Sequence, residues 1–206
     1  MKYPEMKWGR MEAVVNMLGG ETGIDDFLAH QFVLADPKKH KKGAKAPEPL
    51  FTFAGRFTTE GTKEFVAAKK FVRDTSENAR VKISFIGSNF EKHLLPKIEC
   101  DVAGGILNIQ KLRRASIDLP KNPDEPGTIA GLGGLEKADT GLYGFHEALA
   151  YKQSVGDSSP LVGFAYDDNN VLWAVSADWD DGGWHVGANS PSNPGEWDAG
   201  NEFVSR

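Results

Sequence analysis

The chain has 206 residues, 40% of them hydrophobic, and a formal net charge of −5 at pH 7. No apolar run approaches the ~18 residues that a membrane-spanning helix requires, and the N-terminus lacks the apolar stretch of a secretory signal. The one cysteine, Cys100, excludes an internal disulfide. These features predict a globular protein of the cytoplasm, without a membrane partner.

The charges are unevenly distributed along the chain. Residues 1–114 hold 20 Lys and Arg against 14 Asp and Glu, whereas residues 115–206 hold 4 against 15. A basic front and an acidic rear suit an interaction surface or head-to-tail association, and uneven solubilisation is the alternative. The acidic half gives no reason to expect nucleic-acid binding.

The first 36 residues have the pattern of a helical hairpin. Apolar side chains at helical spacing predict one helix over residues 6–18, which Gly19-Gly20 ends. Thr22 can cap a second helix over residues 23–32. That helix carries two acids and no Lys or Arg, which makes it a poor recognition helix for DNA. We therefore predict an N-terminal αα-hairpin over residues 1–36.

A lysine-rich stretch follows the hairpin. Residues 37–49, PKKHKKGAKAPEP, contain five lysines and no apolar periodicity, which is typical of a solvated linker. Its basic run could contact phosphate. However, it has no interleaved aromatic residues on which bases could stack. A linker is the preferred interpretation, and nucleic acid is not an expected partner.

Residues 50–206 have the pattern of an α+β body. We predict a mainly antiparallel sheet of five or six strands, covered by helices, because alternating and helical periodicities are interspersed. Phe203-Val204 is short enough to be an edge strand or a docked tail. The other predicted strands before the C-terminal region are 50–57, 81–86 and 106–119, and the predicted helices are 62–72, 88–95 and 140–153.

Three alternating runs between Leu161 and Ser190 predict a C-terminal β-meander. A turn at Asp181-Gly182 pairs Trp179 with Trp184 and Asp178 with His185. A turn centred on Asp168-Asn169 would pair Tyr166 with Val171, Phe164 with Trp173 and Val162 with Val175. Both registers place one apolar set on a single core face. That set is Val162, Phe164, Tyr166, Val171, Trp173, Val175, Ala177, Trp179, Trp184, Val186 and Ala188.

The pairing of Asp178 with His185 is the strongest catalytic candidate in the chain. It lies on the face opposite the predicted core, beside Ser176 and close to Asn189. A carboxylate that orients a histidine beside a hydroxyl resembles a hydrolase triad. The alternative is a surface charge pair of the kind that commonly decorates sheets.

Metal and cofactor sites are not predicted. Asp178, Asp180 and Asp181 precede glycine, but the EF-hand spacing is incomplete and lacks its bidentate glutamate. The five histidines show no zinc-ligand spacing, and Cys100 stands alone.

The end of the chain gathers residues that suit a binding surface. Aromatic faces with amide and carboxylate groups can bind sugars or a protein, because the ring covers apolar C–H surface while polar groups set orientation. The alternative is that Trp197 closes the edge of the sheet. The candidate binding residues are Trp197, Asn189, Asn193, Asp198 and Asn201.

Several segments resemble, in matching order, a family of small proteins that recurs in uncultured bacterial lineages with reduced genomes. The segments are MEAVVNMLGGETGIDDFL, FIGSNFEKHLLPKIE, ADTGLYGFHEALAYKQ, VLWAVSADW, GGWHVGANS, PSNPGEWDAG and FVSR. The resemblance spans most of the chain and implies that residues 1–206 are one recurring unit. It implies no activity, cofactor or catalytic residue.

The expected function is that of a non-enzymatic interaction module of the cytoplasm. This prediction depends on the incomplete catalytic and metal motifs, and it places the binding surface on the acidic C-terminal part. A hydrolase-like enzyme using Asp178 and His185 and a carbohydrate-binding module using Trp197 are the alternatives. A protein is the expected partner, with a small molecule or glycan as alternatives. The sequence leaves the oligomeric state open.

Overall fold

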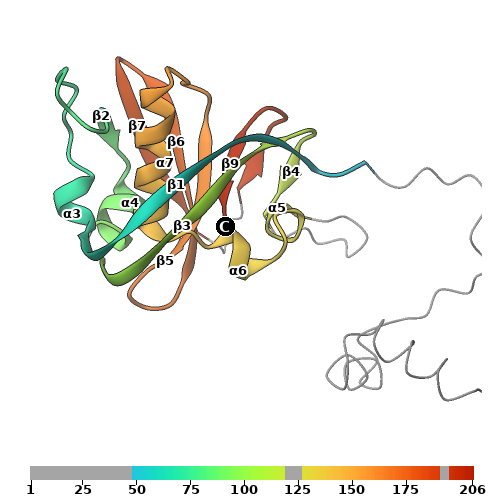
Figure 1. Cartoon of the computed structure of the whole chain (residues 1–206), viewed down its shortest axis with the longest axis horizontal. Helices are drawn as coiled ribbons and strands as arrows, with labels where there is room; N and C mark the ends of the chain where they lie inside the picture. Colours follow the sequence, from blue (N-terminus) through green and yellow to red (C-terminus); the bar gives the residue numbers. More distant parts are fainter. Residues whose placement is uncertain (1–47, 119–126, 191–194) are drawn as a thin grey trace, which may run out of the picture. The chain divides into compact units, whose positions relative to one another are not determined.

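A computed structural model of the chain describes residues 48–118, 127–190 and 195–206. These residues form an α+β unit in which a curved sheet carries a long helix, α7, on one face (Figure 1). The α+β prediction is thereby confirmed for the body. The hairpin predicted over residues 1–36 and linker residues 37–47 lie outside the described residues.

The main sheet has seven strands in the order β1-β3-β9-β5-β6-β7-β2. It is mixed, because β5 pairs with β9, and β2 with β7, in parallel while the other pairings are antiparallel. The strands are β1 (Phe51–Val66), β2 (Ile83–Ile86), β3 (Ile98–Leu112), β5 (Leu161–Tyr166), β6 (Leu172–Asp180), β7 (Gly183–Asn189) and β9 (Glu202–Ser205).

Short helices and a second small sheet complete the body. Strands β4 (Ser116–Ile117) and β8 (Glu196–Trp197) pair antiparallel. No helix of the described residues is long and apolar enough to cross a membrane. The helices are α3 (Ala67–Lys70), α4 (Ser88–His93), α5 (Thr128–Gly131), α6 (Leu135–Ala138) and α7 (Gly141–Ser154).

The helix predicted over residues 62–72 is wrong for most of its length. Strand β1 continues to Val66, and the helical part is limited to α3. The reason is a long-range partner: β3 begins at Ile98, earlier than predicted, and pairs with β1 through Val66↔Ile98. Cross-strand pairing and burial of Phe65 override the local helical periodicity.

Strand β9 occupies the centre of the sheet and not its edge. It lies between β3 and β5, with Val204 opposite Ile109 and Phe203 opposite Val162. Phe203 and Val204 are both fully buried. Their side chains point to opposite faces of the sheet, as successive strand residues must, so this strand contributes to both sides of the core.

The predicted meander is present, but its two hairpins differ in how well their registers were predicted. The β6–β7 register is confirmed, with Trp179 opposite Trp184 and Asp178 opposite His185. The β5–β6 register is wrong by one residue, because Phe164 lies opposite Ala174.

The slip in the β5–β6 register follows from the turn. Asn170 adopts a positive φ of 59°, and the Asp167 N–H donates to the Val171 carbonyl. The loop is therefore one residue longer than a two-residue turn centred on Asp168-Asn169. The buried Asp167 carboxylate fixes it by accepting the backbone N–H groups of Asn169 and Val171 and the Trp173 indole N–H.

The corrected register divides the apolar residues between two cores, one on each face of the sheet. Trp173, Val175 and Trp184 belong to the helix-side core beneath α7. Val162 and Phe164 belong instead to a second core on the other face. The residues that cover this second core from outside the main sheet include Ile129, Leu132, Ala138 and Trp197.

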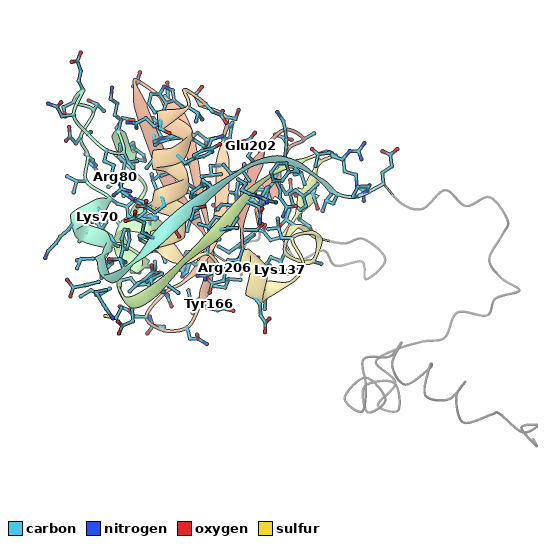
Figure 2. The ribbon with its side chains drawn as sticks, viewed as in Figure 1. Lys70, Arg80, Lys137, Tyr166, Glu202 and Arg206 are labelled. Carbon is cyan, nitrogen blue, oxygen red and sulfur yellow. The ribbon has the colours of Figure 1, made fainter. Side chains whose placement is uncertain are left out.

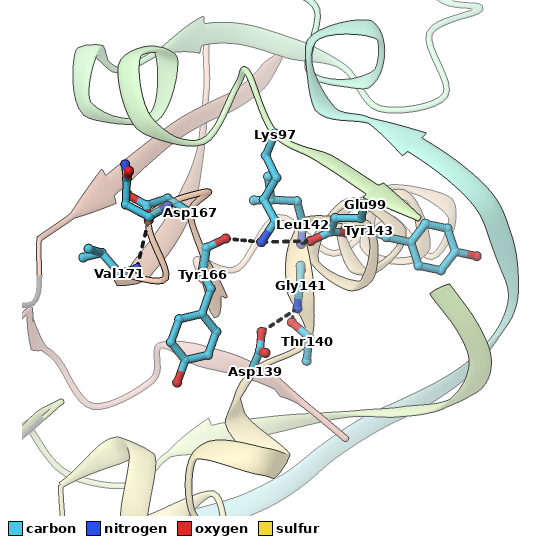
Figure 3. A network of polar contacts seen from close by, with 11 residues as sticks. Lys97, Glu99, Asp139, Thr140, Gly141, Leu142, Tyr143, Tyr166, Asp167 and Val171 are labelled. Atoms are coloured by element: carbon cyan, nitrogen blue, oxygen red, sulfur yellow. Dashed lines mark hydrogen bonds and ion pairs between the residues drawn. The ribbon is translucent and has the colours of Figure 1, made fainter. Parts of the chain in front are cut away.

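The N-terminus of α7 is fixed by a carboxylate from a distant strand (Figure 3). The Glu99 carboxylate accepts the backbone N–H groups of Leu142 and Tyr143, each at 2.8 Å. Asp139 accepts the N–H of Gly141 at 3.0 Å. Lys97, which donates to the Tyr166 carbonyl, lies 3.8 Å from Glu99. The first N–H groups of the helix are thus paired with negative charge where the helix dipole favours it.

Replacing Glu99 tests how much this cap stabilises the fold. We expect Glu99→Ala to lower the free energy of unfolding by about 1–2 kcal/mol, the range for a lost helix cap, in urea unfolding followed by circular dichroism. Glu64→Ala, which removes an exposed carboxylate from the neighbouring strand, is the matched control and should change stability little. Equal losses in the two variants would contradict the role given to the cap.

Candidate functional site

One part of the main sheet leaves its outward face open. Over β5, β9 and Ala174 of β6 that face is buried under the second core, but over the rest of β6 and over β7 and β2 the outward side chains are half-buried or exposed. We call this surface the polar sheet face. It consists of Ser176, Asp178, Asp180, His185, Asn189 and Phe85. It therefore includes the three predicted catalytic candidates and one predicted binding residue.

Asp178 and His185 lie side by side in the strand register without forming a relay. No hydrogen bond joins their side chains in the part of the chain that the structure describes, and Ser176 lies opposite Gly187, two pairs further along the hairpin. The His185 ring instead lies against Phe85, with ring centroids 5.5 Å apart. General-base activation of a hydroxyl requires contacts of about 2.6–3.2 Å, so the candidates share a face but not the required geometry.

A hollow of about 450 Å³ adjoins the polar sheet face at the β2 edge. The Arg73 guanidinium lies over the Phe85 ring, 5.8 Å from its centroid, while Asp181 and His185 line the same hollow. Ser84 also lines the hollow, and its hydroxyl donates to the Asp180 carbonyl at 3.2 Å. Cation, aromatic ring, imidazole and carboxylate thus meet around one open space, which suits the side chains of a bound peptide.

The other predicted binding residues do not form one surface. Trp197 is buried, and its ring packs edge-on against Phe203 in the second core. Trp197 is therefore a core residue, as the alternative expected, but it covers the interior strand β9 and not an edge of the sheet. The Asn201 side chain accepts the exposed Asp198 N–H, which ties the turn before β9. Asn189 is half-buried on the polar sheet face, and Asn193 lies outside the described residues.

Asp118 is a buried carboxylate that the sequence did not predict as a site residue. It accepts the Trp197 indole N–H at 2.6 Å, the Thr128 hydroxyl at 2.8 Å and the Gly195 N–H at 3.0 Å. These bonds join the small sheet to α5, so the role is structural. No motif marks Asp118, because its partners come from segments 10 to 79 residues away.

The C-terminal residue is also anchored to the body. The Arg206 N–H donates to the Lys137 carbonyl at 2.8 Å, and the two residues lie side by side (Figure 2). The Arg206 side chain donates from Nε to the Asp139 carbonyl at 2.9 Å. These bonds hold the end of β9 against α6, away from the polar sheet face.

No protein-family model, curated protein or solved structure matches the chain.

The pKa of Asp118 gives a prediction for stability against pH. Burial raises the pKa of this carboxyl above 3.8, and the hydrogen bonds from Trp197, Thr128 and Gly195 offset part of that effect. A raised folded pKa means that the folded protein binds the proton more tightly than the unfolded chain does. Its contribution to stability is therefore present below pH 3.8 and is lost as pH rises through the folded pKa.

We expect wild type to gain stability relative to Asp118→Asn as pH is lowered from 7 toward 4, because the Asn side chain does not titrate. Urea unfolding of both proteins across this range measures the difference. A difference in free energy that stays constant with pH would contradict the raised pKa.

Proposed function

We propose that the body is a protein-interaction module whose polar sheet face binds a basic segment of another protein. The observation that carries this proposal is the exposure of Phe85, at 50%, between Arg73 and His185 and beside a set of carboxylates. A large aromatic side chain at the centre of a charged surface is typical of a binding anchor.

The charge of the surface sets the chemistry of the partner. Asp178, Asp180 and Asp181 are exposed, and none of them forms an ion pair with another described residue. Three carboxylates without a cation of their own attract Lys and Arg side chains and speed their encounter. The acidic excess over residues 115–206 acts in the same direction.

The edge of the sheet offers backbone groups as well. Beyond an isolated bridge between Asp74 and Ile83, no strand of the described residues covers the outer edge of β2. An extended segment can pair with such an edge while its side chains enter neighbouring pockets. The hollow beside Phe85 provides one such pocket.

The exposed thiol of Cys100 suits the proposed location of this interaction in the cytoplasm. A reducing compartment keeps such a thiol free of disulfides.

Two pairs of matched variants test the proposal on a partner recovered from a lysate of the source cells. We expect Phe85→Ala to weaken binding by about 2 kcal/mol, roughly thirtyfold, as loss of an anchor does. Phe53→Ala is the control, since Phe53 is 63% exposed and also lies beneath an arginine, Arg56. Affinities measured by biolayer interferometry with full-length protein separate the two.

The contribution of the carboxylates is tested in the same experiment with Asp178→Asn. We expect weaker binding and a smaller loss of affinity between low and moderate salt, because one attractive charge is gone. Asp168→Asn removes an exposed carboxylate from the β5–β6 turn and should leave the affinity unchanged. A partner that binds all four variants as it binds wild type would overturn the proposed surface.

A further inference from the structure

We propose that Asp180, Asp181 and His185 bind a divalent transition-metal ion of the zinc type at the tip of the β6–β7 hairpin. Each of the three residues offers one ligand atom, and these atoms all lie within 4.8 Å of one another. Asp178, which faces His185 in the register, lies outside this group. The site shares these residues with the surface proposed to bind a protein, but metal binding requires no partner.

The hairpin holds the backbone of the site in place. Asp181 and Gly182 have φ values of 50° and 77°, the signs that a type I′ turn requires. The strands are paired up to the turn through Asp180↔Gly183. Behind the turn, Trp179 and Trp184 pack edge-to-face with ring centroids 5.1 Å apart. The ligand-bearing backbone is therefore ordered before a metal arrives, which reduces the entropic cost of binding.

The ligand distances are close to those of a bound ion. Zinc lies about 2.0–2.2 Å from imidazole nitrogen and carboxylate oxygen, so two ligand atoms on a tetrahedral ion are about 3.4 Å apart. The carboxylates of Asp180 and Asp181 are exposed, and the ligand atoms, which lie within 4.8 Å of one another, need to approach by up to about 1.4 Å. Rotation about their side-chain bonds supplies this movement without a backbone change.

His185 is the pre-oriented ligand. It is half-buried, and its ring lies tilted by 51° against Phe85 in the adjacent strand. This contact restricts the imidazole, and the two carboxylates lie within reach of it. An imidazole in the donor set favours Zn²⁺, Ni²⁺ or Cu²⁺ over Ca²⁺ and Mg²⁺, which prefer oxygen ligands alone.

The surroundings leave the local charge negative and the coordination sphere open. Arg73 and Asp74 both line the adjacent hollow and carry opposite charges that cancel. The two ligand carboxylates therefore make the net charge around the site negative. Asp181 and His185 line the same hollow, which leaves space for water or an exogenous ligand on the ion. An ion with three protein ligands and an open position has the coordination of an accessible zinc site.

Titration of Zn²⁺ into the full-length chain, followed by calorimetry, tests the site. We expect His185→Ala and Asp181→Asn each to weaken Zn²⁺ binding by at least about tenfold, since even loss of an outer-shell group costs that much. Asp168→Asn, which removes an exposed carboxylate from the β5–β6 turn, is the matched control and should bind as wild type does. Because His30 and His40 are also present in the chain, the comparison between variants isolates this site.

The location of the ion is tested separately on the unmodified protein. Substoichiometric Ni²⁺, which is paramagnetic, should broaden the backbone amide signals of residues 180–186 first in a nitrogen–proton correlation spectrum. Excess Ca²⁺ should leave that broadening in place. Broadening centred elsewhere, or equal Zn²⁺ affinity in wild type and His185→Ala, would overturn the proposal. Loss of partner binding in Phe85→Ala has no bearing on either readout.

Discussion

The fold depends on one buried cation. The Lys152 side chain near the end of α7 is fully buried, and its ammonium donates to Glu202 of β9 and, at 2.6 Å, to Asp157. Removing one partner from such a group leaves an unpaired charge in the interior and lowers the free energy of unfolding by about 3–5 kcal/mol. The ion pair between Lys152 and Glu202 therefore fixes the position of helix α7 relative to strand β9. Because β9 joins the β1–β3 pair to β5, β6, β7 and β2, the same contact assembles the sheet whose far side carries the polar sheet face.

The sequence predicted the parts of the fold whose causes are local. The β6–β7 register follows from Asp181-Gly182, which nearly dictate their turn. The β5–β6 register is an exception with a local cause, because the Asp167 carboxylate accepts hydrogen bonds from residues two, four and six positions later and the resulting loop is one residue longer than the expected turn. The extension of β1 to Val66 depends on a partner strand that starts at Ile98. Helical periodicity within one segment carries no information about such a partner.

The same division applies to the site. The placement of Asp178 opposite His185 was correct, because the hairpin register determines it. The grouping of His185 with Phe85 was not predictable, since β2 lies 100 residues earlier and pairs in parallel. Trp197, in contrast, was predicted to lie on a binding surface and is buried in the second core. Its neighbours in the sequence are polar and turn-forming, yet its indole reaches back 79 residues to the buried Asp118 carboxylate. Composition near a residue thus describes its surroundings poorly when the contacts are long-range.

The central position of β9 also has a consequence for how the chain reaches its native state. Residues 108–111 pair with residues 202–205, and the seam between β3 and β5 has no other strand to fill it. Contacts of such large sequence separation form slowly, because loop-closure entropy must be overcome first. Until β9 inserts, β3 and β5 each present an unpaired edge to solvent, and such edges can pair with those of another chain. Recovery of the folded protein from denaturant should therefore compete with aggregation, and the balance between them depends on chain concentration.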